Sequence, residues 1–208
     1  MPDGETRVSA LAAGYRVGSF GAAAAGPGVV LRERRPLAIV QIATWPRQSP
    51  AAQAAASGVL GGASLPTAPN TSTTAGATAV LSIGPERWLV VAPERASDDL
   101  AAALASALGG ALAAVTDLSH SRTVLRLTGP RTPELLAKGC ALDLHRSKFP
   151  VGACAQGLLA PFGVLIHAVD ETPSFDLYVA RSYALALWEW LGESAAEYGY
   201  RVEAPFTG

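Results

Sequence analysis

The sequence contains little cysteine and no long hydrophobic run. Its 208 residues include two cysteines, Cys140 and Cys154. Two cysteines are too few for the disulfide framework of a small secreted domain, so we expect reduced thiols in a cytoplasmic protein, with a disulfide between them as the alternative. No apolar run approaches the roughly 20 residues of a membrane-spanning helix, and the N-terminal residues do not resemble a secretory signal. We therefore expect no membrane partner.

An excess of positive charge is also missing. Lysine and arginine number 16 against 17 acidic residues, which gives a net charge of −1. A surface that binds nucleic acid needs basic residues to neutralise phosphates, so we expect no nucleic-acid partner. Half of the residues are hydrophobic and only 16% are charged, a composition typical of a globular protein with a substantial core.

The chain divides by pattern into three parts. Residues 1–35 show no sustained hydrophobic period, and we predict an extended, partly flexible N-terminal arm. Residues 36–203 are predicted to form a single α+β domain with lobes at about 36–140 and 141–203. A short tail at 204–208 follows.

Within the domain, strands and helices follow one another in a recognisable order. Strands are predicted at 36–43, 79–83, 87–92, 111–116, 122–127, 153–159, 163–168 and 175–180. Helices are predicted at 51–57, between Ser97 and Gly109, at 133–138 and after Ser182, with a long loop at 61–78. Helices packed on antiparallel sheets in this order indicate an α+β fold with two ferredoxin-like halves.

Motifs for nucleotide cofactors and metals are missing. The sequence has no Gly-x-Gly-x-x-Gly between a strand and a helix, and no Gly-x-x-x-x-Gly-Lys-Ser/Thr. Cys140, His145 and Cys154 lack the paired short spacing of structural zinc sites. We predict neither a metal site nor a bound cofactor on this chain.

The first polar segment of interest lies between two predicted strands. Here Asp117, Ser119 and Arg122 surround His120 in the sequence. A Ser-His-Asp hydrolase is one interpretation, but neighbouring side chains tend to point apart and no nucleophile elbow is present. We favour a polar network that locks the turn, or a contact with a partner, and we predict no catalytic residue.

The second polar segment is a basic loop that contains His145, Arg146 and Lys148. A solvated connector is the simplest interpretation. Alternatively, Arg146 and Lys148 contact an acidic surface or the glutamate tail of a folate. His167, within an apolar strand, is expected to be a hydrogen-bonded core histidine. The candidate contacts to folate or to a partner are therefore Asp117, Ser119, His120, Arg122, His145, Arg146 and Lys148.

Six motifs together resemble a known family. They are Gly84–Leu89, Asp117–Arg122, Leu127–Pro130, Leu136–His145, Phe149–Gln156 and Leu185–Leu191. Their order and spacing, over roughly residues 30–200, resemble the gamma subunits of heterotetrameric sarcosine oxidase. That family is similar in fold to the tetrahydrofolate-binding aminomethyltransferases of glycine cleavage, whose Asp-x-Ser-His pattern followed by a Gly-Pro turn is echoed at Asp117 to Pro130.

The resemblance implies a complex with alpha, beta and delta subunits, of which alpha is the expected direct contact. Such a complex demethylates sarcosine oxidatively to glycine and produces hydrogen peroxide and, with tetrahydrofolate, its methylene derivative. FAD, FMN, NAD, zinc and tetrahydrofolate are then expected on the partner subunits, with the flavins and NAD on alpha and beta and the zinc on delta.

One departure from the aminomethyltransferases bears on catalysis. Where they carry a Gly-Gly-x-x-Asp-Asp strand, this chain has Phe162–His167 and no carboxylate for acid-base work. We therefore expect a non-catalytic assembly subunit that docks through its sheet face, the Trp188/Trp190 helix and the arm. The alternatives are an independent folate-dependent aminomethyltransferase and a sheet-edge interaction module unrelated to amine oxidation.

Overall fold

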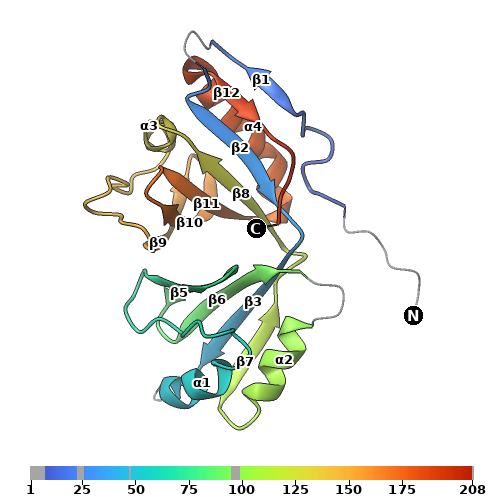
Figure 1. Ribbon diagram of the computed structural model, residues 1–208, viewed down its shortest axis with the longest axis vertical. Coiled ribbons are helices and arrows are strands. Elements are labelled where there is room, and N and C mark those ends of the chain that lie inside the picture. The colour runs from blue at the N-terminus through green and yellow to red at the C-terminus, as the bar shows by residue number, and fades with distance from the viewer. Residues whose placement is uncertain (1–7, 23–25, 47, 95–98, 208) are drawn as a thin grey trace.

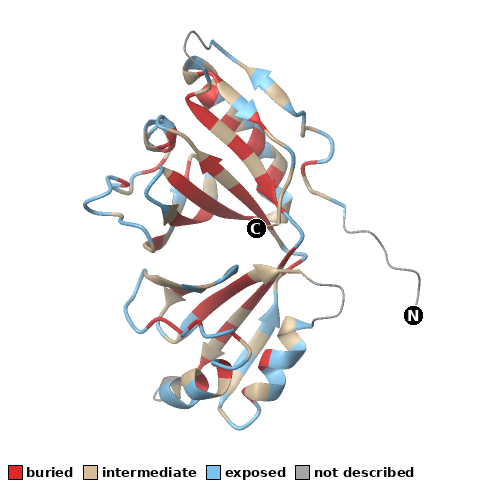
Figure 2. Cartoon of the chain, viewed as in Figure 1, coloured by how far each residue is buried: buried red, intermediate tan, exposed pale blue. Residues whose placement is uncertain are grey.

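Two β-sheets pack face to face, and helices cover the outer face of each sheet (Figure 1). The computed structural model describes residues 8–22, 26–46, 48–94 and 99–207. Buried residues follow the strands of both sheets (Figure 2). The chain therefore forms four layers in the order helix, sheet, sheet, helix.

The smaller sheet has five strands, which are β3 (Leu37–Thr44), β4 (Ser72–Ala75), β5 (Thr78–Gly84), β6 (Arg87–Pro93) and β7 (Ala113–Asp117). Their order is β4-β5-β6-β3-β7, and all neighbours are antiparallel. Helix α1 (Ser49–Ala56) follows β3, and helix α2 (Leu100–Ala107) follows β6. Apart from the edge strand β4, this is the β-α-β-β-α-β arrangement of a ferredoxin-like half.

The larger sheet has seven strands, which are β1 (Gly18–Phe20), β2 (Val29–Arg34), β8 (Arg122–Thr128), β9 (Cys154–Leu159), β10 (Phe162–Asp170), β11 (Ser174–Ala180) and β12 (Tyr200–Val202). Their order is β1-β12-β2-β8-β11-β10-β9. Helix α3 (Thr132–Ala137) follows β8. Helix α4 (Ala184–Ala195) precedes β12, with 3₁₀ turns at Arg181–Tyr183 and Ala196–Tyr198. The same arrangement recurs, with β2 inserted between β8 and β12, so both predicted ferredoxin-like halves are present.

Strand alternation builds the layers. In β3, Val40 and Ile42 face the helices of the smaller sheet, where they pack with Leu104 of α2. The alternate residues of β3, Leu37 and Ile39, face the larger sheet. The buried residues of this layer between the sheets are Leu37, Ile39, Leu81, Leu89, Val91, Val124, Cys154, Leu165 and Tyr178.

Strands β1 and β2 lie before Pro36 and belong to the larger sheet, so the prediction of an extended, partly flexible arm over residues 1–35 is wrong for these strands. Strand β2 pairs with both β8 and β12, and Leu11 is fully buried. Strand β2 was not predicted because Glu33 and Arg34 are charged although they are buried. Two charged residues at buried positions interrupt the alternation of apolar and polar residues that marks a strand. The first seven residues of the predicted arm lie outside the described residues.

The boundary between the two sheets also differs from the predicted lobe boundary near residue 140. It lies in the turn at 118–121, because β8 pairs with β2 and β11 of the larger sheet. The described part of the predicted tail, residues 204–207, is paired as well. The backbone carbonyl of Phe206 accepts a hydrogen bond of 2.8 Å from the Arg35 amide, and its amide donates to Glu33. Both boundaries depend on pairing between distant segments.

Two local predictions also change. The predicted loop at 61–78 contains β4, which pairs with β5. Helix α2 is capped by Asp99, whose Oδ1 accepts a hydrogen bond of 2.9 Å from the Ala102 amide. Ser97, where this helix was predicted to begin, lies outside the described residues.

An apolar stripe of α4 is buried on the larger sheet, where Ala184, Leu187 and Leu191 join the core. Trp188 lies in the same stripe and is only 6% exposed. Its ring stacks on Tyr15, with the ring centroids 4.8 Å apart. The N-terminal segment therefore covers Trp188 itself, while docking of a partner through the rest of the Trp188/Trp190 helix stays a prediction.

Both cysteines are free and buried. Burial raises the pKa of the Cys154 thiol to about 11, so this group is a neutral thiol at physiological pH. Within the described part of the chain, no helix combines the length and apolar character needed to cross a membrane.

Candidate functional site

The turn between β7 and β8 is held by a local polar network. The amide and hydroxyl of Ser119 both donate to Asp117 Oδ1, at 2.8 and 2.5 Å. The buried Ser119 hydroxyl also accepts a hydrogen bond of 2.9 Å from the Ile39 amide in β3. Asp117 and Ser119 thus fix the turn to strand β3 of the smaller sheet.

The other two residues of this segment lie outside the network. His120 is exposed at the turn. Arg122 is half-buried, and its Nη1 donates to the Ser121 carbonyl over 3.4 Å. The hydroxyl of Ser119 is engaged by Asp117 and Ile39, so these side chains do not form the hydrogen-bonded Ser-His-Asp chain that a hydrolase requires.

Replacing Ser119 by Ala is expected to lower the free energy of unfolding by about 1–3 kcal/mol, because the buried Ile39 amide loses its acceptor. Urea unfolding measures this change. Ser121→Ala is the matched control, since the Ser121 hydroxyl donates to Leu118 at an exposed position. Equal stability of the Ser119→Ala and Ser121→Ala variants would contradict the bracing role.

The second predicted segment forms part of an open cavity of about 360 Å³. His145 lines it, and the His145 Nδ1 lies 2.8 Å from the Ser147 hydroxyl. Arg146 pairs with Glu171 at 3.0 Å, but both side chains are about four-fifths exposed, so the pair adds little stability. Lys148 is exposed on the same loop.

A separate open cavity of about 300 Å³ lies between the two sheets. Its polar lining residues are Gln41, Arg122, Gln156 and Tyr178, and β10 contributes Gly163, Val164 and Leu165. The structure therefore places Arg122 away from the cavity of His145 and Arg146. No acidic side chain of the described chain lines the inter-sheet cavity, so the carboxylate that aminomethyl transfer would use is missing from this wall.

A buried ionic cluster on the larger sheet was not predicted. Asp176 of β11 is fully buried between Arg34 of β2 and Arg126 of β8. Arg34 Nη1 lies 2.5 Å from Asp176 Oδ2, and Arg126 contacts both carboxylate oxygens, through Nε and through Nη2 at 2.9 Å. The sequence gives one indication of this cluster. Arg126 and Asp176 are single charged residues inside the otherwise apolar strands β8 and β11.

His167 lies beside this cluster, directly across from Asp176 in the sheet. Its Nε2 lies 2.9 Å from the Ser72 hydroxyl, which confirms the predicted hydrogen-bonded core histidine. Burial lowers the pKa of His167 to about 4; the Asp176 carboxylate opposes this shift, while Arg126 and Arg34 add to it. The imidazole is therefore neutral at physiological pH.

Tyr178 is the second titratable group in this region. Burial, and then the charge of Asp176, raise its pKa above the ordinary value. Its hydroxyl and the Nδ1 of His167 have no hydrogen-bond partner among the described residues. No group of three or more histidine, cysteine or acidic side chains within residues 8–22, 26–46, 48–94 and 99–207 is arranged to hold a metal ion.

The arrangement of two ferredoxin-like halves is shared with a known class of enzymes. The glycine cleavage system aminomethyltransferase T from Bartonella henselae superposes with a TM-score of 0.60 at 18% identity, covering 86% of this chain and 48% of that protein. At this identity the likeness establishes the fold alone. The chain thus has the fold of part of an aminomethyltransferase.

The comparisons also identify one family among the proteins that have this fold. The model of the "Sarcosine oxidase, gamma subunit family" matches residues 47–197. A chain of the heterotetrameric sarcosine oxidase from Corynebacterium sp. U-96, solved with pyrrole 2-carboxylate, is 31% identical with a TM-score of 0.75, covering 84% of this chain and 87% of that chain. The chain belongs to the sarcosine oxidase gamma subunit family, as the sequence motifs predicted.

A curated relative agrees with this assignment. Sarcosine oxidase subunit gamma of Corynebacterium sp. strain P-1 is 39% identical over 121 residues. The aligned stretch covers 58% of this chain and 58% of that relative, so the match spans little more than half of the relative's length.

Proposed function

We propose that this chain is the gamma subunit of a heterotetrameric sarcosine oxidase and that it stabilises the assembly without supplying catalytic groups. The observation that carries the proposal is a family fold whose inter-sheet cavity has no carboxylate among the described residues. Other polar side chains have structural roles. Asp117 is hydrogen-bonded to Ser119, and Asp176 is paired with Arg126.

In this proposal the chemistry belongs to the partner subunits. Alpha, beta and delta carry FAD, FMN, NAD, zinc and tetrahydrofolate. With dioxygen as the electron acceptor, which is reduced to hydrogen peroxide, the complex oxidises the N-methyl group of sarcosine and transfers this carbon to tetrahydrofolate, which gives glycine and methylene-tetrahydrofolate. The alpha subunit is the proposed direct contact of this chain. We also propose a cytoplasmic location, which the free thiols of Cys140 and Cys154 support.

Purification of the chain with and without its partners tests the proposal. Alone, the chain is expected to show no flavin absorbance and no sarcosine-dependent peroxide. Co-expressed with the partner subunits, it is expected to copurify with them and with sarcosine oxidase activity. Stoichiometric flavin on the isolated chain, or peroxide production by it, would falsify the non-catalytic role.

A calorimetric titration of the isolated chain with tetrahydrofolate tests the alternative of an independent aminomethyltransferase. We expect no binding heat, because tetrahydrofolate is proposed to bind a partner subunit. Tight stoichiometric binding would instead support that alternative.

A further inference from the structure

A groove lies between the N-terminal segment, residues 8–22, and helix α4. The segment approaches the helix closely at two points. A Cβ atom on Gly14 would lie only 2.8 Å from Leu185, and the Ala22 amide donates to the Ala196 carbonyl at 3.0 Å. The groove has a volume of about 260 Å³. This volume lies below the roughly 300–1,000 Å³ of typical small-molecule sites, so the groove suits one inserted side chain better than a cofactor. We call it the α4 groove, and the lining residues that bear on its chemistry are Arg16, Phe20, Trp188, Glu189, Glu193 and Tyr200.

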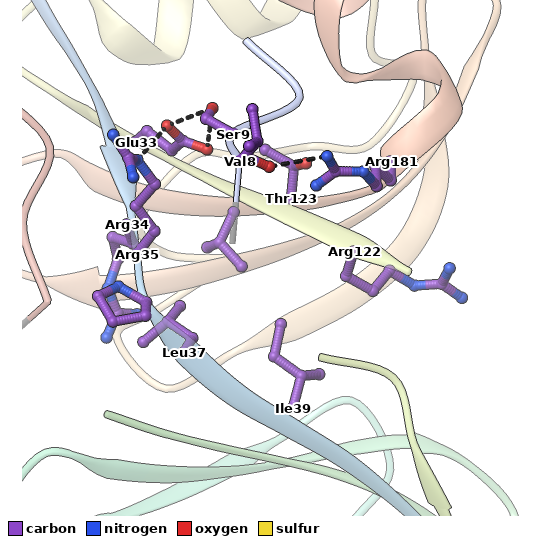
Figure 3. A pocket seen from close by; sticks show the side chains of 12 residues that line it. Val8, Ser9, Glu33, Arg34, Arg35, Leu37, Ile39, Arg122, Thr123 and Arg181 are labelled. Atoms are coloured by element: carbon purple, nitrogen blue, oxygen red, sulfur yellow. Dashed lines mark hydrogen bonds and ion pairs between the residues drawn. The ribbon is translucent and has the colours of Figure 1, made fainter. Parts of the chain in front are cut away.

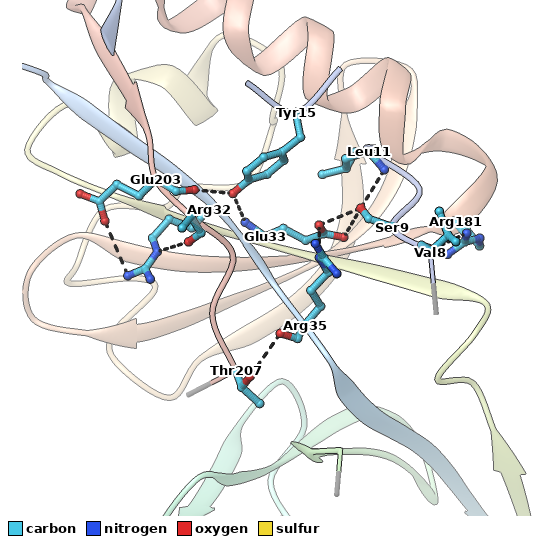
Figure 4. A network of polar contacts seen from close by, with 11 residues as sticks. Val8, Ser9, Leu11, Tyr15, Arg32, Glu33, Arg35, Arg181, Glu203 and Thr207 are labelled. Atoms are coloured by element: carbon cyan, nitrogen blue, oxygen red, sulfur yellow. Dashed lines mark hydrogen bonds and ion pairs between the residues drawn. The ribbon is translucent and has the colours of Figure 1, made fainter. Parts of the chain in front are cut away.

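Polar contacts hold the N-terminal wall of the α4 groove in place. Figure 3 shows the first of them, in which Arg181 Nη2 donates to the Val8 carbonyl at 2.7 Å. Figure 4 shows the next, at Tyr15, whose hydroxyl donates to the Glu203 carbonyl at 2.6 Å and accepts a hydrogen bond of 3.0 Å from the Glu33 amide. These contacts fix the segment to the larger sheet, so the groove is formed before any partner arrives.

The floor of the α4 groove is aromatic and aliphatic. Trp188 and Val202 are buried at its base. Phe20 stacks on Tyr200, with the ring centroids 5.2 Å apart. The Tyr200 hydroxyl lies against α4, since a Cβ atom on Gly192 would be 3.1 Å from it. Long charged side chains lay their aliphatic stems along such apolar surfaces, and aromatic rings attract cations. The floor therefore suits a lysine or arginine side chain.

Two carboxylates of α4 line the same groove. Glu189 and Glu193 are exposed and one helical turn apart, so their side chains are neighbours on one face of the helix. In the part of the chain that the structure describes, neither carboxylate forms an ion pair. Arg16, exposed on the N-terminal segment, adds a single positive charge to the lining. Like charges one turn apart repel each other, and a cation placed between them relieves this repulsion.

We propose that the α4 groove receives a lysine or arginine side chain of a partner subunit, whose cationic group binds Glu189 and Glu193. This contact rests on the proposed function of the chain as a subunit of a heterotetramer. Charge complementarity defines the occupant, because a negatively charged lining repels acidic side chains and attracts basic ones. The apolar floor selects a cation that is carried on a long aliphatic stem. Docking of a partner through helix α4 thereby acquires a defined chemistry.

The test measures the dissociation constant of this chain from its assembled partners, at low and high salt, for Glu189→Gln, Glu193→Gln and the double variant. The double variant is expected to weaken association on the order of 10-fold at low salt, because the cationic side chain loses both carboxylates, and less at high salt, where ions screen the attraction. Arg16→Gln is expected to strengthen association about 2- to 3-fold at low salt, since it removes a charge that repels the occupant. Thermal unfolding of each isolated variant checks that the fold is kept.

Glu134→Gln is the matched control, since Glu134 is exposed on α3 and pairs with Arg131 at 3.0 Å. It is expected to bind the partners as the wild type does. If the wild type assembles and the double variant at Glu189 and Glu193 binds as tightly as Glu134→Gln, the α4 groove is not the contact and the inference is overturned, while the proposed function stands. Weaker binding of Arg16→Gln would indicate an acidic occupant and overturn the inference as well. If the wild type does not assemble, both are overturned.

Discussion

Replacing Asp176 by Asn is expected to lower the free energy of unfolding by about 3–5 kcal/mol. The substitution keeps the shape of the side chain but removes the buried negative charge that Arg34 and Arg126 share. Two guanidinium groups then lie close together on the larger sheet without the carboxylate that compensates them, and an uncompensated buried charge carries a large desolvation cost. Equilibrium urea unfolding followed by circular dichroism measures the loss.

Two further variants keep this prediction testable if Asp176→Asn does not accumulate as folded protein. Arg126→Lys retains the charge but loses the two-oxygen contact with Asp176, so a smaller loss of about 1–2 kcal/mol is expected. Glu171→Gln breaks the exposed pair with Arg146 and should change stability by less than about 0.5 kcal/mol. If Asp176→Asn were as stable as Glu171→Gln, the cluster would have no structural role.

Acidification is expected to destabilise the protein through His167. Its pKa in the folded state is about 4, below the ordinary value of 6.5. Between these values the unfolded chain binds a proton that the folded protein does not, so stability is complete above pH 6.5 and falls as the pH drops toward 4. The shift corresponds to about 3 kcal/mol lost over this range.

Unfolding free energies measured from pH 7 to pH 4 test this dependence. His167→Gln is expected to flatten the slope between pH 6.5 and 4, because glutamine does not titrate, whatever its effect on stability at pH 7. Parallel slopes for the His167→Gln variant and the wild type would show that another group controls the acid response.

Elements with a clear local period could be predicted from the sequence. The β5–β6 hairpin and the buried stripe of α4 follow from alternation and helical spacing, and both are present. The bracing contacts of Asp117 and Ser119 could also be anticipated, because the two residues are two positions apart in a turn. In these cases the stabilising partner lies nearby in the chain.

Elements that depend on distant partners could not be predicted. Strand β4 consists of small polar residues and exists because it pairs with β5. The Asp176 cluster joins three strands, and sequence alone does not show that Arg34 and Arg126 meet there. An isolated charge within an apolar strand was the one usable clue, since a buried charge requires a partner.

The insertion of β2 between β8 and β12 constrains how the chain reaches its native state. About 170 residues separate β2 from its parallel neighbour β12, so this pairing closes a very long loop. The larger sheet cannot be completed until its last strand, β12, has left the ribosome. All five strands of the smaller sheet, in contrast, lie in one continuous stretch of the chain between β2 and β8 of the larger sheet. Folding during synthesis is therefore expected to begin with the five-stranded half, and division of the gene near residue 120 should give a C-terminal fragment that lacks a central strand.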